Sequence, residues 1–493
     1  MNDRRATTPL ERDPDDVLAE LRRLREADAA THGGHVLAYV YDADDAALDE
    51  LAAEASLLAL PVNGLDPTAF PSVAVMERDL VRRARELLGG DEEVVGTATS
   101  GGTESCLLAV KTARDAWRAA GGTGRARVVL PVTAHPAFHK AAHYLDVEPV
   151  VVPVDPVSCA VRPEDVGAHL DARACLVVVS APSYPHGVVD PVEAVAALAA
   201  RNGVACHVDA CIGGMVLPFV DPGAAVSRWD LSAPGVTSLS VDLHKYGYAP
   251  KGVSLLLHRR RDRARFQPFA LTSWPGYAVV NTTVLGSKPA APLAAAWAIG
   301  EALGVPGYRV LAERALAATG QLVRALAGVR GLRVVGDPGA TLIAVAADEA
   351  AEEADRVDPH HLADALRARG WVIQPQPALE TTAGRLPRTA HLTVTAVTAR
   401  VVEELVSAVA QAADEVRGAP PAEANADLLA AAGQLDVQVL DVATAQGLLA
   451  VAGLAAGESL PSRMAPVMAL IERLPPALAQ RLLIEYVAGL SEP

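Results

Sequence analysis

The sequence predicts an α/β fold with a central, mainly parallel sheet, followed by a smaller C-terminal α+β domain. Between about residues 94 and 257, short apolar runs alternate with amphipathic helical patterns, which is typical of βαβ units. The apolar runs are rich in β-branched residues, as buried parallel strands usually are. They read "ARVVLPV", "EPVVVPV", "ACLVVVSAP", "VACHVDA" and "TSLSVDL". Helical patterns such as "ESCLLAVKTARDAWRAA" and "DPVEAVAALAARN" lie between them.

The same patterns divide the chain into four parts. We expect an N-terminal helical or extended segment over residues 1–70 and a large α/β domain over 71–305, which ends in a long helix near 290–303. A small α+β domain over 306–416 is predicted from "LRVVGDP", "TLIAVAAD", "HHLADALRARG" and "HLTVTAV". The stretch "RGAPPAEANAD" indicates a linker, so residues 417–493 are predicted to be a linker and a helical tail.

Composition excludes several classes of partner. At 493 residues the chain is too long for one simple core, and its formal charge of −16 argues against nucleic acid or an anionic membrane as a partner. The five cysteines form no C-x-x-C pair, which favours a reduced, cytoplasmic protein. The N-terminus lacks the apolar core of a signal peptide, and we expect no integral membrane segment.

The first candidate for chemistry is "TATSGGTES", a turn of small residues that opens a predicted helix. Backbone N–H groups in such a turn can approach an anion closely, and a helix N-terminus favours negative charge. The turn is not a Walker A loop, because no G-K-[ST] follows. The alternative is an ordinary helix cap by Ser100 or Thr103.

Two further candidates follow predicted strands. Asp209, in "HVDACIGG", ends a strand and would be costly to bury without a cationic partner, such as a protonated pyridine nitrogen. It could instead cap the following turn. His135, in "AHPAFHKAAHYLD", could stack on a flat cofactor or be a structural histidine. In the same segment His139 and His143 lie four apart, but Lys140 stands where a zinc-protease motif needs glutamate, so no metal site is predicted.

The fourth candidate is Lys245 in "SVDLHKYGYAPKG", between His244 and Tyr246 at the end of a predicted strand. A lysine in a partly desolvated pocket has a lowered pKa and can form a Schiff base. Taken alone, this lysine is more simply explained as structural. Together, however, the anion turn, His135, Asp209 and Lys245 supply the four contacts that pyridoxal 5'-phosphate requires.

These motifs carry a family resemblance. The stretches "TSGGTES", "AHPAFHKAAHY", "YPHGVVDPV", "HVDACIGG" and "DLHKYGYAPKG" resemble those of the pyridoxal-phosphate-dependent group II decarboxylase superfamily, and most closely its sphingosine-1-phosphate lyase-like branch. The resemblance runs from about residue 35 to 300 and continues more weakly beyond. It implies pyridoxal-phosphate fold type I, the aspartate-aminotransferase-like fold.

The resemblance also implies roles for individual residues. Lys245 would form the Schiff base, Asp209 would pair with the pyridine nitrogen, and His135 would stack on the ring. The implied cofactor-binding residues are Gly101, Gly102, Thr103, His135, Asp209, Cys211, His244 and Lys245.

On the substrate side, Tyr41 and Lys251 match residues that line the pocket in these lyases, and we count both as catalytic candidates. Ser287 and Lys288 match a Ser-Arg pair that helps to bind the substrate phosphate. The family works as a homodimer with the active site at the interface, so Tyr41 could serve the neighbouring subunit.

The implied reaction cleaves the Cα–Cβ bond of a β-hydroxy amine, expected to be phosphorylated, to an aldehyde and an amine through an external aldimine. An L-amino-acid decarboxylase of the same superfamily is an alternative, in which Lys288 or an arginine would hold the substrate carboxylate. A non-catalytic homologue is a third hypothesis. The cofactor motifs do not distinguish the first two.

Several substrate-side positions depart from the lyase pattern. They are Asp66, Thr68, Val279, Asn281, Thr282 and Lys288, which replace histidine, aspartate, tyrosine, serine, proline and arginine respectively. Lysine keeps a charge for phosphate but loses the bidentate geometry of arginine. Asp66 would repel a phosphate if it faced the pocket. The natural substrate is therefore left open by the sequence.

Overall fold

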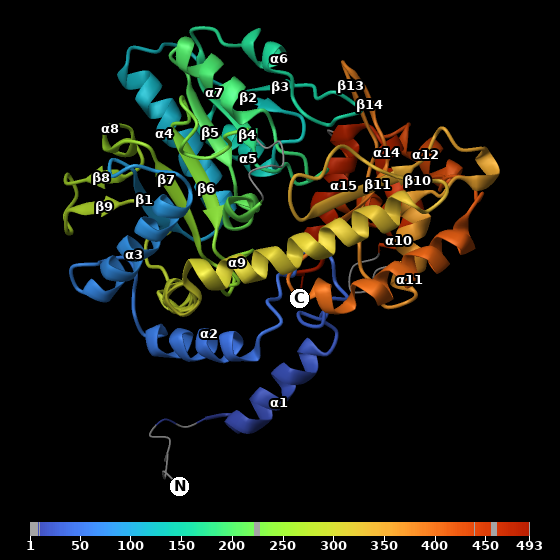
Figure 1. Cartoon of the computed structure of the whole chain (residues 1–493), viewed down its shortest axis with the longest axis horizontal. Helices are drawn as coiled ribbons and strands as arrows, with labels where there is room; N and C mark the ends of the chain where they lie inside the picture. Colours follow the sequence, from blue (N-terminus) through green and yellow to red (C-terminus); the bar gives the residue numbers. More distant parts are fainter. Residues whose placement is uncertain (1–7, 9, 221–226, 438, 455–460, 493) are drawn as a thin grey trace.

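The computed structural model describes residues 8, 10–220, 227–437, 439–454 and 461–492 (Figure 1). A central sheet with helices on both faces occupies one side of the view. A smaller sheet with its own helices occupies the other, and the long helix α9 (Ala291–Ala327) extends from the first part to the second.

The central sheet has seven strands in the order β1-β7-β6-β5-β4-β2-β3. The five predicted apolar runs form β2 (Arg127–Pro131), β3 (Glu148–Val152), β4 (Ala174–Ser180), β5 (Ala205–Asp209) and β6 (Ser238–Asp242), and neighbouring members of this group pair in parallel. The prediction of a mainly parallel α/β sheet is confirmed.

The remaining two strands are β1 (Val95–Thr99) and β7 (Ser254–His258). β7 runs antiparallel to both β1 and β6, because the chain turns back after β6 instead of crossing over through a helix. That reversal is the segment that carries Lys245, so the predicted Schiff-base lysine lies in a turn between two buried strands.

Helices cover both faces of this sheet. They are α3 (Pro71–Leu87), α4 (Gly102–Ala119), α5 (Pro136–Leu145), α6 (Pro163–Gly167), α7 (Val192–Arg201) and α8 (Arg261–Ala264), with the short 3-10 turns η1 (Gly213–Met215) and η2 (Leu217–Phe219). Helices α4 and α5 pack on one face through an apolar cluster that includes Val110, Phe138 and Leu176. A larger cluster fills the opposite face.

Before the sheet, α2 (Ala46–Ala59) packs against α9, whereas α1 (Pro14–Arg25) projects away from the body and has no buried residue. An exposed hairpin of β8 (Phe269–Leu271) and β9 (Val279–Asn281) lies on the side of the central sheet where β1 and β7 are found.

Helix α9 agrees with the long helix expected near residues 290–303 but continues well past it. Its backbone is kinked at Gly304, where φ is 53°, and Pro306 follows. The kink falls close to the expected boundary between the large and small domains, which stays a prediction.

The small domain contains a four-stranded antiparallel sheet in the order β10-β11-β15-β12, as the α+β prediction requires. Its strands are β10 (Leu332–Val334), β11 (Leu342–Ala347), β12 (Gln374–Gln376) and β15 (Thr389–Thr393), and a second hairpin pairs β13 (Leu379–Thr381) with β14 (Gly384–Leu386). Its helices are η3 (Glu353–Asp355), α10 (Pro359–Arg367) and α11 (Thr398–Val416).

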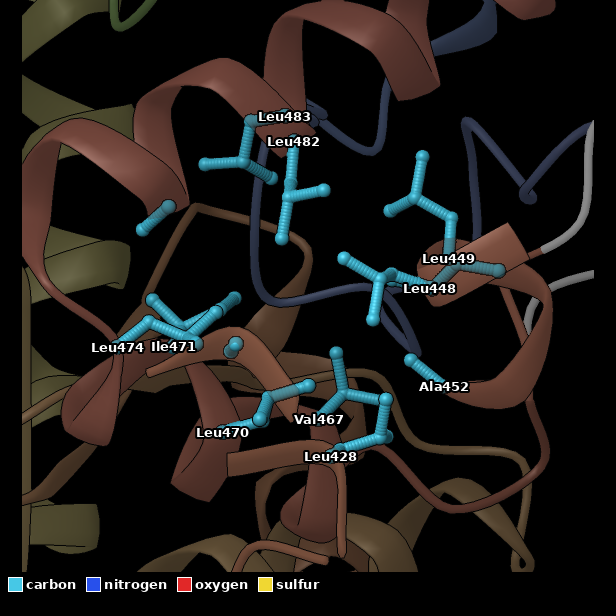
Figure 2. Close-up of a pocket in the computed structure, with 13 residues that line it drawn as sticks. Leu428, Leu448, Leu449, Ala452, Val467, Leu470, Ile471, Leu474, Leu482 and Leu483 are labelled. Atoms are coloured by element: carbon cyan, nitrogen blue, oxygen red, sulfur yellow. The ribbon is translucent and has the colours of Figure 1, made fainter. Parts of the chain in front are cut away.

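The tail is helical, as the sequence suggests, and has its own apolar core. It consists of α12 (Ala426–Ala432), α13 (Val442–Val451), α14 (Ala465–Arg473) and α15 (Pro476–Gly489). Leucines from all four helices meet around a cavity of about 40 Å³ (Figure 2). None of the helices in the described part of the chain combines the length and apolar character needed to cross a bilayer.

Buried polar contacts fix the tail to the small domain. Glu472 of α14 accepts from Arg388 Nε at 2.7 and 2.9 Å. Asp364 of α10 accepts from the backbone N–H groups of Met464 and Ala465 at 2.7 and 3.0 Å, which caps the start of α14. The tail is therefore an integral part of the folded chain.

Candidate active site

A cavity of about 810 Å³ opens at the carboxyl ends of the central strands, where ligands bind in doubly wound sheets. Ten predicted site residues line it: Tyr41, Gly101, Gly102, Thr103, His135, Asp209, Cys211, His244, Lys245 and Lys251. The fold thus brings together residues from five separate segments of the chain.

Lys245 lies in the turn after β6, and its Nζ is 2.8 Å from Oδ2 of Asp242. Although burial alone would lower the pKa of Lys245, the Asp242 carboxylate raises it well above the usual value. The expectation of a lowered lysine pKa is therefore wrong for this structure. A substrate or cofactor that reacts with the amine must first draw the lysine away from Asp242.

Asp242 is a site residue that the sequence reasoning missed. Its side chain is 2% exposed, accepts a hydrogen bond from Ser254 and has an Oδ2 3.6 Å from His244 Nε2. Burial opposes its ionisation, but the charges of Lys245 and His244 lower its pKa. The available signal was its position three residues before the lysine in "SVDLHKYG".

The anion turn is built for close backbone approach. A Cβ on Gly102 would lie 2.8 Å from a carboxylate oxygen of Asp242 and 2.9 Å from Cys211 Sγ, so no larger residue fits there without movement. Helix α4 begins at Gly102 with Gly101 as N-cap and no side-chain cap. The alternative of a Ser100 or Thr103 cap is therefore wrong, and the first-turn N–H groups are free of a capping side chain.

Glu104, in the first turn of α4, lines the cavity and accepts two backbone hydrogen bonds. One oxygen accepts from the Ser100 N–H at 2.5 Å and the other from the Val284 N–H. The side chain is buried and holds the turn against the loop that precedes Ser287. Glu104 is a second residue that the sequence reasoning missed.

His244 lies beside this turn. Its Nδ1 donates to the carbonyl oxygen of Val253 at 2.7 Å, which leaves Nε2 as the ring atom available to a ligand. Burial lowers the pKa of His244, so the neutral ring predominates near pH 7 in the free site. A bound phosphate would favour the protonated form, in which Nε2 can donate.

Asp209 ends β5, is 8% exposed, and accepts at Oδ1 from the Cys211 N–H at 3.1 Å. No lysine or arginine in the described part of the chain pairs with it. The hydrogen bond agrees with the turn-capping alternative. A buried carboxylate without a cationic side-chain partner is also the group that a protonated pyridine nitrogen requires.

His135 stands at the edge of the cavity as the N-cap of α5. Its Nδ1 accepts from the Ala137 N–H at 3.2 Å, which fixes the ring and leaves Nε2–H free in the neutral tautomer. The two readings of this histidine, structural cap and ring-stacking group, are therefore compatible in one side chain.

Lys251 and Tyr41, which are predicted to lie on the substrate side, both line the cavity. Lys251 Nζ lies 4.7 Å from the centre of the Tyr41 ring and donates to the His244 carbonyl oxygen at 3.0 Å. Partial desolvation, followed by the charge of Lys245, lowers the pKa of Lys251 to about 8. Burial raises the pKa of Tyr41 to about 12, so its hydroxyl stays protonated.

Two further residues line the cavity although the sequence did not single them out as site residues. Tyr184 donates to Gln374 Oε1 at 2.5 Å, and both side chains line the cavity. Tyr184 lies in the quoted stretch "YPHGVVDPV", but Gln374 comes from β12 of the small domain and follows no motif. The small domain therefore closes one side of the site.

Ser287 and Lys288 are not brought to this cavity within one chain. Lys288 lines a neighbouring cavity of about 200 Å³, which shares Lys251 and Gly252 with the main one. Ser287 is exposed, with its hydroxyl 3.4 Å from Asn63 Nδ2. Their role at the substrate phosphate stays a prediction.

Asp66 lies outside both cavities within one chain. It is exposed, and its Oδ1 accepts from the Thr68 N–H at 2.8 Å in a local turn. Hydrogen bonds from Thr68 lower its pKa. The repulsion of a phosphate, which was conditional on Asp66 facing the pocket, does not arise within a single chain.

The site fits pyridoxal 5'-phosphate on structural grounds alone. The Gly102 cradle and the start of α4 suit the phosphate, Asp209 suits the ring nitrogen, and Lys245 suits the aldehyde. All three groups line one cavity.

Comparison with known proteins agrees with this assignment. The pyridoxal-dependent decarboxylase conserved domain matches residues 11–271, and a family described as "Pyridoxal-dependent enzyme, C-terminal putative HTH domain" matches residues 426–489. The structure of a Burkholderia pseudomallei sphingosine-1-phosphate lyase is similar, with a TM-score of 0.76, 32% identity and coverage of 84% of this chain and 94% of that one. A Lactobacillus brevis glutamate decarboxylase structure, 22% identical, with a TM-score of 0.72 and coverage of 84% and 95%, shows the fold alone.

Curated relatives give the same result. Sphingosine-1-phosphate lyase of Arabidopsis thaliana is 33% identical over 82% of this chain and 73% of its own length, and that of rice is 34% identical over 76% and 68%. The enzyme of Dictyostelium discoideum is 35% identical over 68% of this chain, which spans 60% of that relative. The predicted cofactor and fold are confirmed by these matches: the chain belongs to the pyridoxal-dependent decarboxylase family and, within it, to the sphingosine-1-phosphate lyase-like branch.

Proposed function

We propose that this protein is a pyridoxal-phosphate-dependent carbon–carbon lyase that cleaves the Cα–Cβ bond of a phosphorylated β-hydroxy amine to an aldehyde and an amine. The observation that carries the proposal is Lys251, a lysine with a pKa of about 8 in the same cavity as Lys245. Cleavage of this bond requires a base for the β-hydroxyl proton, whereas loss of carbon dioxide does not.

Each of the proposed cofactor-site residues has its own role. Asp209 would pair with a protonated pyridine nitrogen, the start of α4 and His244 would hold the phosphate, and Lys245 would supply the amine that binds the cofactor aldehyde. When bound, the cofactor supplies an electron-withdrawing ring that stabilises the electron pair left by the broken bond. Asp242 receives the ammonium of Lys245 when the lysine is free, and so stabilises the displaced form.

Lys251 accepts the hydroxyl proton in its neutral form. Tyr41, with its hydroxyl protonated and its ring 4.7 Å from Lys251 Nζ, limits the positions that the amine can adopt. The ring face also tolerates the ammonium that forms after proton transfer. Proton transfer and bond cleavage thus take place on the substrate side of one cavity.

We further propose a homodimer of the cytoplasm with the active site near the interface. The β8–β9 hairpin exposes large apolar side chains that a monomer would leave in water, including Trp274 at 43%, Tyr277 at 67% and Val280 at 67%. Ser287 and Lys288 follow this hairpin, so a second copy packed on it would lie close to both. We propose that they bind the substrate phosphate in that assembly.

A substrate panel tests the reaction. Sphingosine 1-phosphate and phosphoethanolamine-type β-hydroxy amines are compared with a set of L-amino acids, and aldehyde and carbon dioxide are both measured. We expect aldehyde without carbon dioxide from the phosphorylated β-hydroxy amines. Lys245→Ala serves as the inactive control, and Lys140→Ala, on an exposed part of α5, as the matched active lysine variant.

The other outcomes are equally informative. Carbon dioxide from an amino acid, without aldehyde, would overturn the lyase proposal in favour of a decarboxylase. A protein that stays colourless with added pyridoxal phosphate would favour a non-catalytic homologue. Phosphate recognition is tested by Lys288→Ala, which we expect to raise KM for the phosphorylated substrate about tenfold or more, since a charged hydrogen bond is worth about 1.5–3 kcal/mol.

A further inference from the structure

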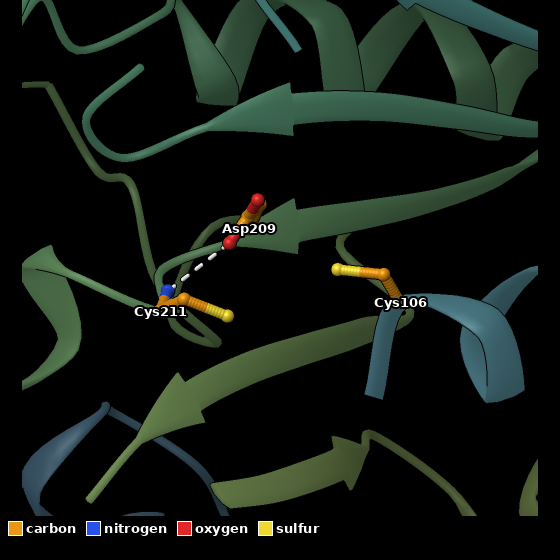
Figure 3. Close-up of side chains that lie close together, drawn as sticks. All are labelled: Cys106, Asp209 and Cys211. Atoms are coloured by element: carbon orange, nitrogen blue, oxygen red, sulfur yellow. Dashed lines mark hydrogen bonds between the residues drawn. The ribbon is translucent and has the colours of Figure 1, made fainter. Parts of the chain in front are cut away.

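Beneath the anion turn, two thiols and a carboxylate converge from three places in the sequence. Cys106 comes from α4, Asp209 ends β5 and Cys211 follows it, and one ligand atom of each lies within 4.8 Å of the other two (Figure 3). All three residues are buried, yet all three line the active-site cavity. Figure 3 shows the two sulfur atoms facing into the space between the helix and the strand.

This ligand set suits a soft or borderline divalent cation. Zinc binds thiolate sulfur at about 2.3 Å and carboxylate oxygen at about 2.0–2.2 Å, so two sulfurs on one tetrahedral zinc lie about 3.8 Å apart. Ligand atoms already within 4.8 Å need to move by only about 1 Å to reach this arrangement. Because all three residues line the cavity, we expect a water molecule to take the fourth position.

The surroundings are also those of a metal site. Asp209 Oδ1 is oriented by the Cys211 N–H at 3.1 Å, and Ser240 Oγ lies 3.3 Å from Cys211 Sγ, where its hydroxyl can donate to a thiolate. The ammonium of Lys245 faces the same cavity and offsets part of the negative charge, to which Asp242 also contributes. Binding of M²⁺ forms two M–S bonds and releases the two thiol protons to solvent.

We propose that Cys106, Asp209 and Cys211 bind one soft divalent cation, of the Zn²⁺ or Cd²⁺ class, in the cofactor-free chain. Because Asp209 is also the partner of the pyridine nitrogen, the cation and pyridoxal phosphate exclude each other. The site holds the apoprotein in a form that cannot load its cofactor until the metal is removed. This inference is independent of which substrate bond is cleaved.

The test uses the full-length apoprotein, freed of cofactor and metal, titrated with Cd²⁺ while thiolate-to-metal charge-transfer absorbance is followed. We expect one cation per chain by equilibrium dialysis. Cys106→Ser and Cys211→Ser should each weaken binding by at least about tenfold. Cys175→Ser is the matched control, since Cys175 is a buried cysteine of β4 outside the cluster.

Competition provides the second readout. Pyridoxal phosphate added to the Cd²⁺-loaded protein should develop its bound-cofactor absorbance only as Cd²⁺ is released, and Cys106→Ser should remove this dependence. Circular dichroism checks that each variant is folded, and Asp209→Asn provides a further ligand variant. Absence of the charge-transfer band, equal affinity in the cysteine variants and the control, or simultaneous binding of metal and cofactor would overturn the proposal. None of these results depends on substrate turnover, so the lyase proposal is tested separately.

Discussion

The active-site cavity and the cavity of the helical tail are built by opposite means. The first measures about 810 Å³, lies at the ends of parallel strands and is lined by charged groups such as Lys245, Asp209 and Asp242. The second measures about 40 Å³ and is lined only by aliphatic side chains such as Leu449, Leu470 and Leu482 (Figure 2). Only the first presents groups that can bind or move a charge.

The active-site cavity positions reactive groups, whereas the tail cavity belongs to an apolar core that stabilises the fold. The strands hold polar side chains at fixed positions because their backbone hydrogen bonds are already made within the sheet. In the tail, apolar burial is itself the source of stability, and no reactive group is present in the lining. Substitutions in the first cavity should therefore change turnover more than stability, and substitutions in the second should do the reverse.

The largest expected effect on turnover is that of Lys245→Ala. Without this amine the proposed Schiff base with the cofactor cannot form, so we expect turnover to fall by at least about 10³-fold and the visible absorbance of that Schiff base to disappear. Absorbance spectra and aldehyde assays measure both. An unchanged spectrum would contradict the role of this residue, and Lys140→Ala should leave it unchanged.

The next largest effect is expected at Lys251. With a pKa of about 8, the amine is charged below that pH and neutral above it, so turnover should rise as pH increases through about 8 and then level off. Lys251→Gln should remove this rise and lower turnover by about 10²–10⁴-fold. A pH–rate profile of kcat, measured for the unsubstituted protein and for Lys251→Gln, tests whether Lys251 is the base. If the rising limb persists in the variant, another group is the base.

A smaller effect is expected from Gly102→Ala. The new methyl group would lie 2.8 Å from an Asp242 oxygen, and the resulting shift of the turn should weaken cofactor binding by about 10-fold or more, since overpacking costs about 1–3 kcal/mol. Equilibrium titration with pyridoxal phosphate measures this. Gly447→Ala, in helix α13 of the tail with no atom near the added carbon, is the matched control and should not change cofactor affinity.

The smallest effect on turnover is expected from Leu478→Ala in the tail. Leu478 is 1% exposed, and its truncation should lower the free energy of unfolding of the tail by about 2–5 kcal/mol. Turnover per cofactor-loaded site should change by less than about twofold. Thermal unfolding and titration of active sites provide the two measurements. A large loss of turnover without loss of stability would contradict the expectation that substitutions in the tail affect stability and not turnover.

Much of the fold was predictable because local patterns dictate local structure. The five β-branched runs became β2 to β6, and the small residues of "TSGGTES" became the start of α4. The reversal of β7 was not predicted, since a buried strand has the same apolar pattern in either direction. The position of Lys288 beside a neighbouring cavity, and not in the main one, was not predicted either. It depends on the loop that follows the exposed β8–β9 hairpin.

By itself, the sequence determined the cofactor chemistry, since each residue that is predicted to contact pyridoxal phosphate lies in a short motif at the end of a strand or the start of a helix. Only the tertiary structure decided the charge of Lys245, through Asp242, and the closure of the site by Gln374 of the small domain. It alone placed Cys106 beside Asp209 and Cys211, which no sequence spacing suggested. The physical reason is that pKa values and ligand sets depend on distances between segments that are far apart along the chain.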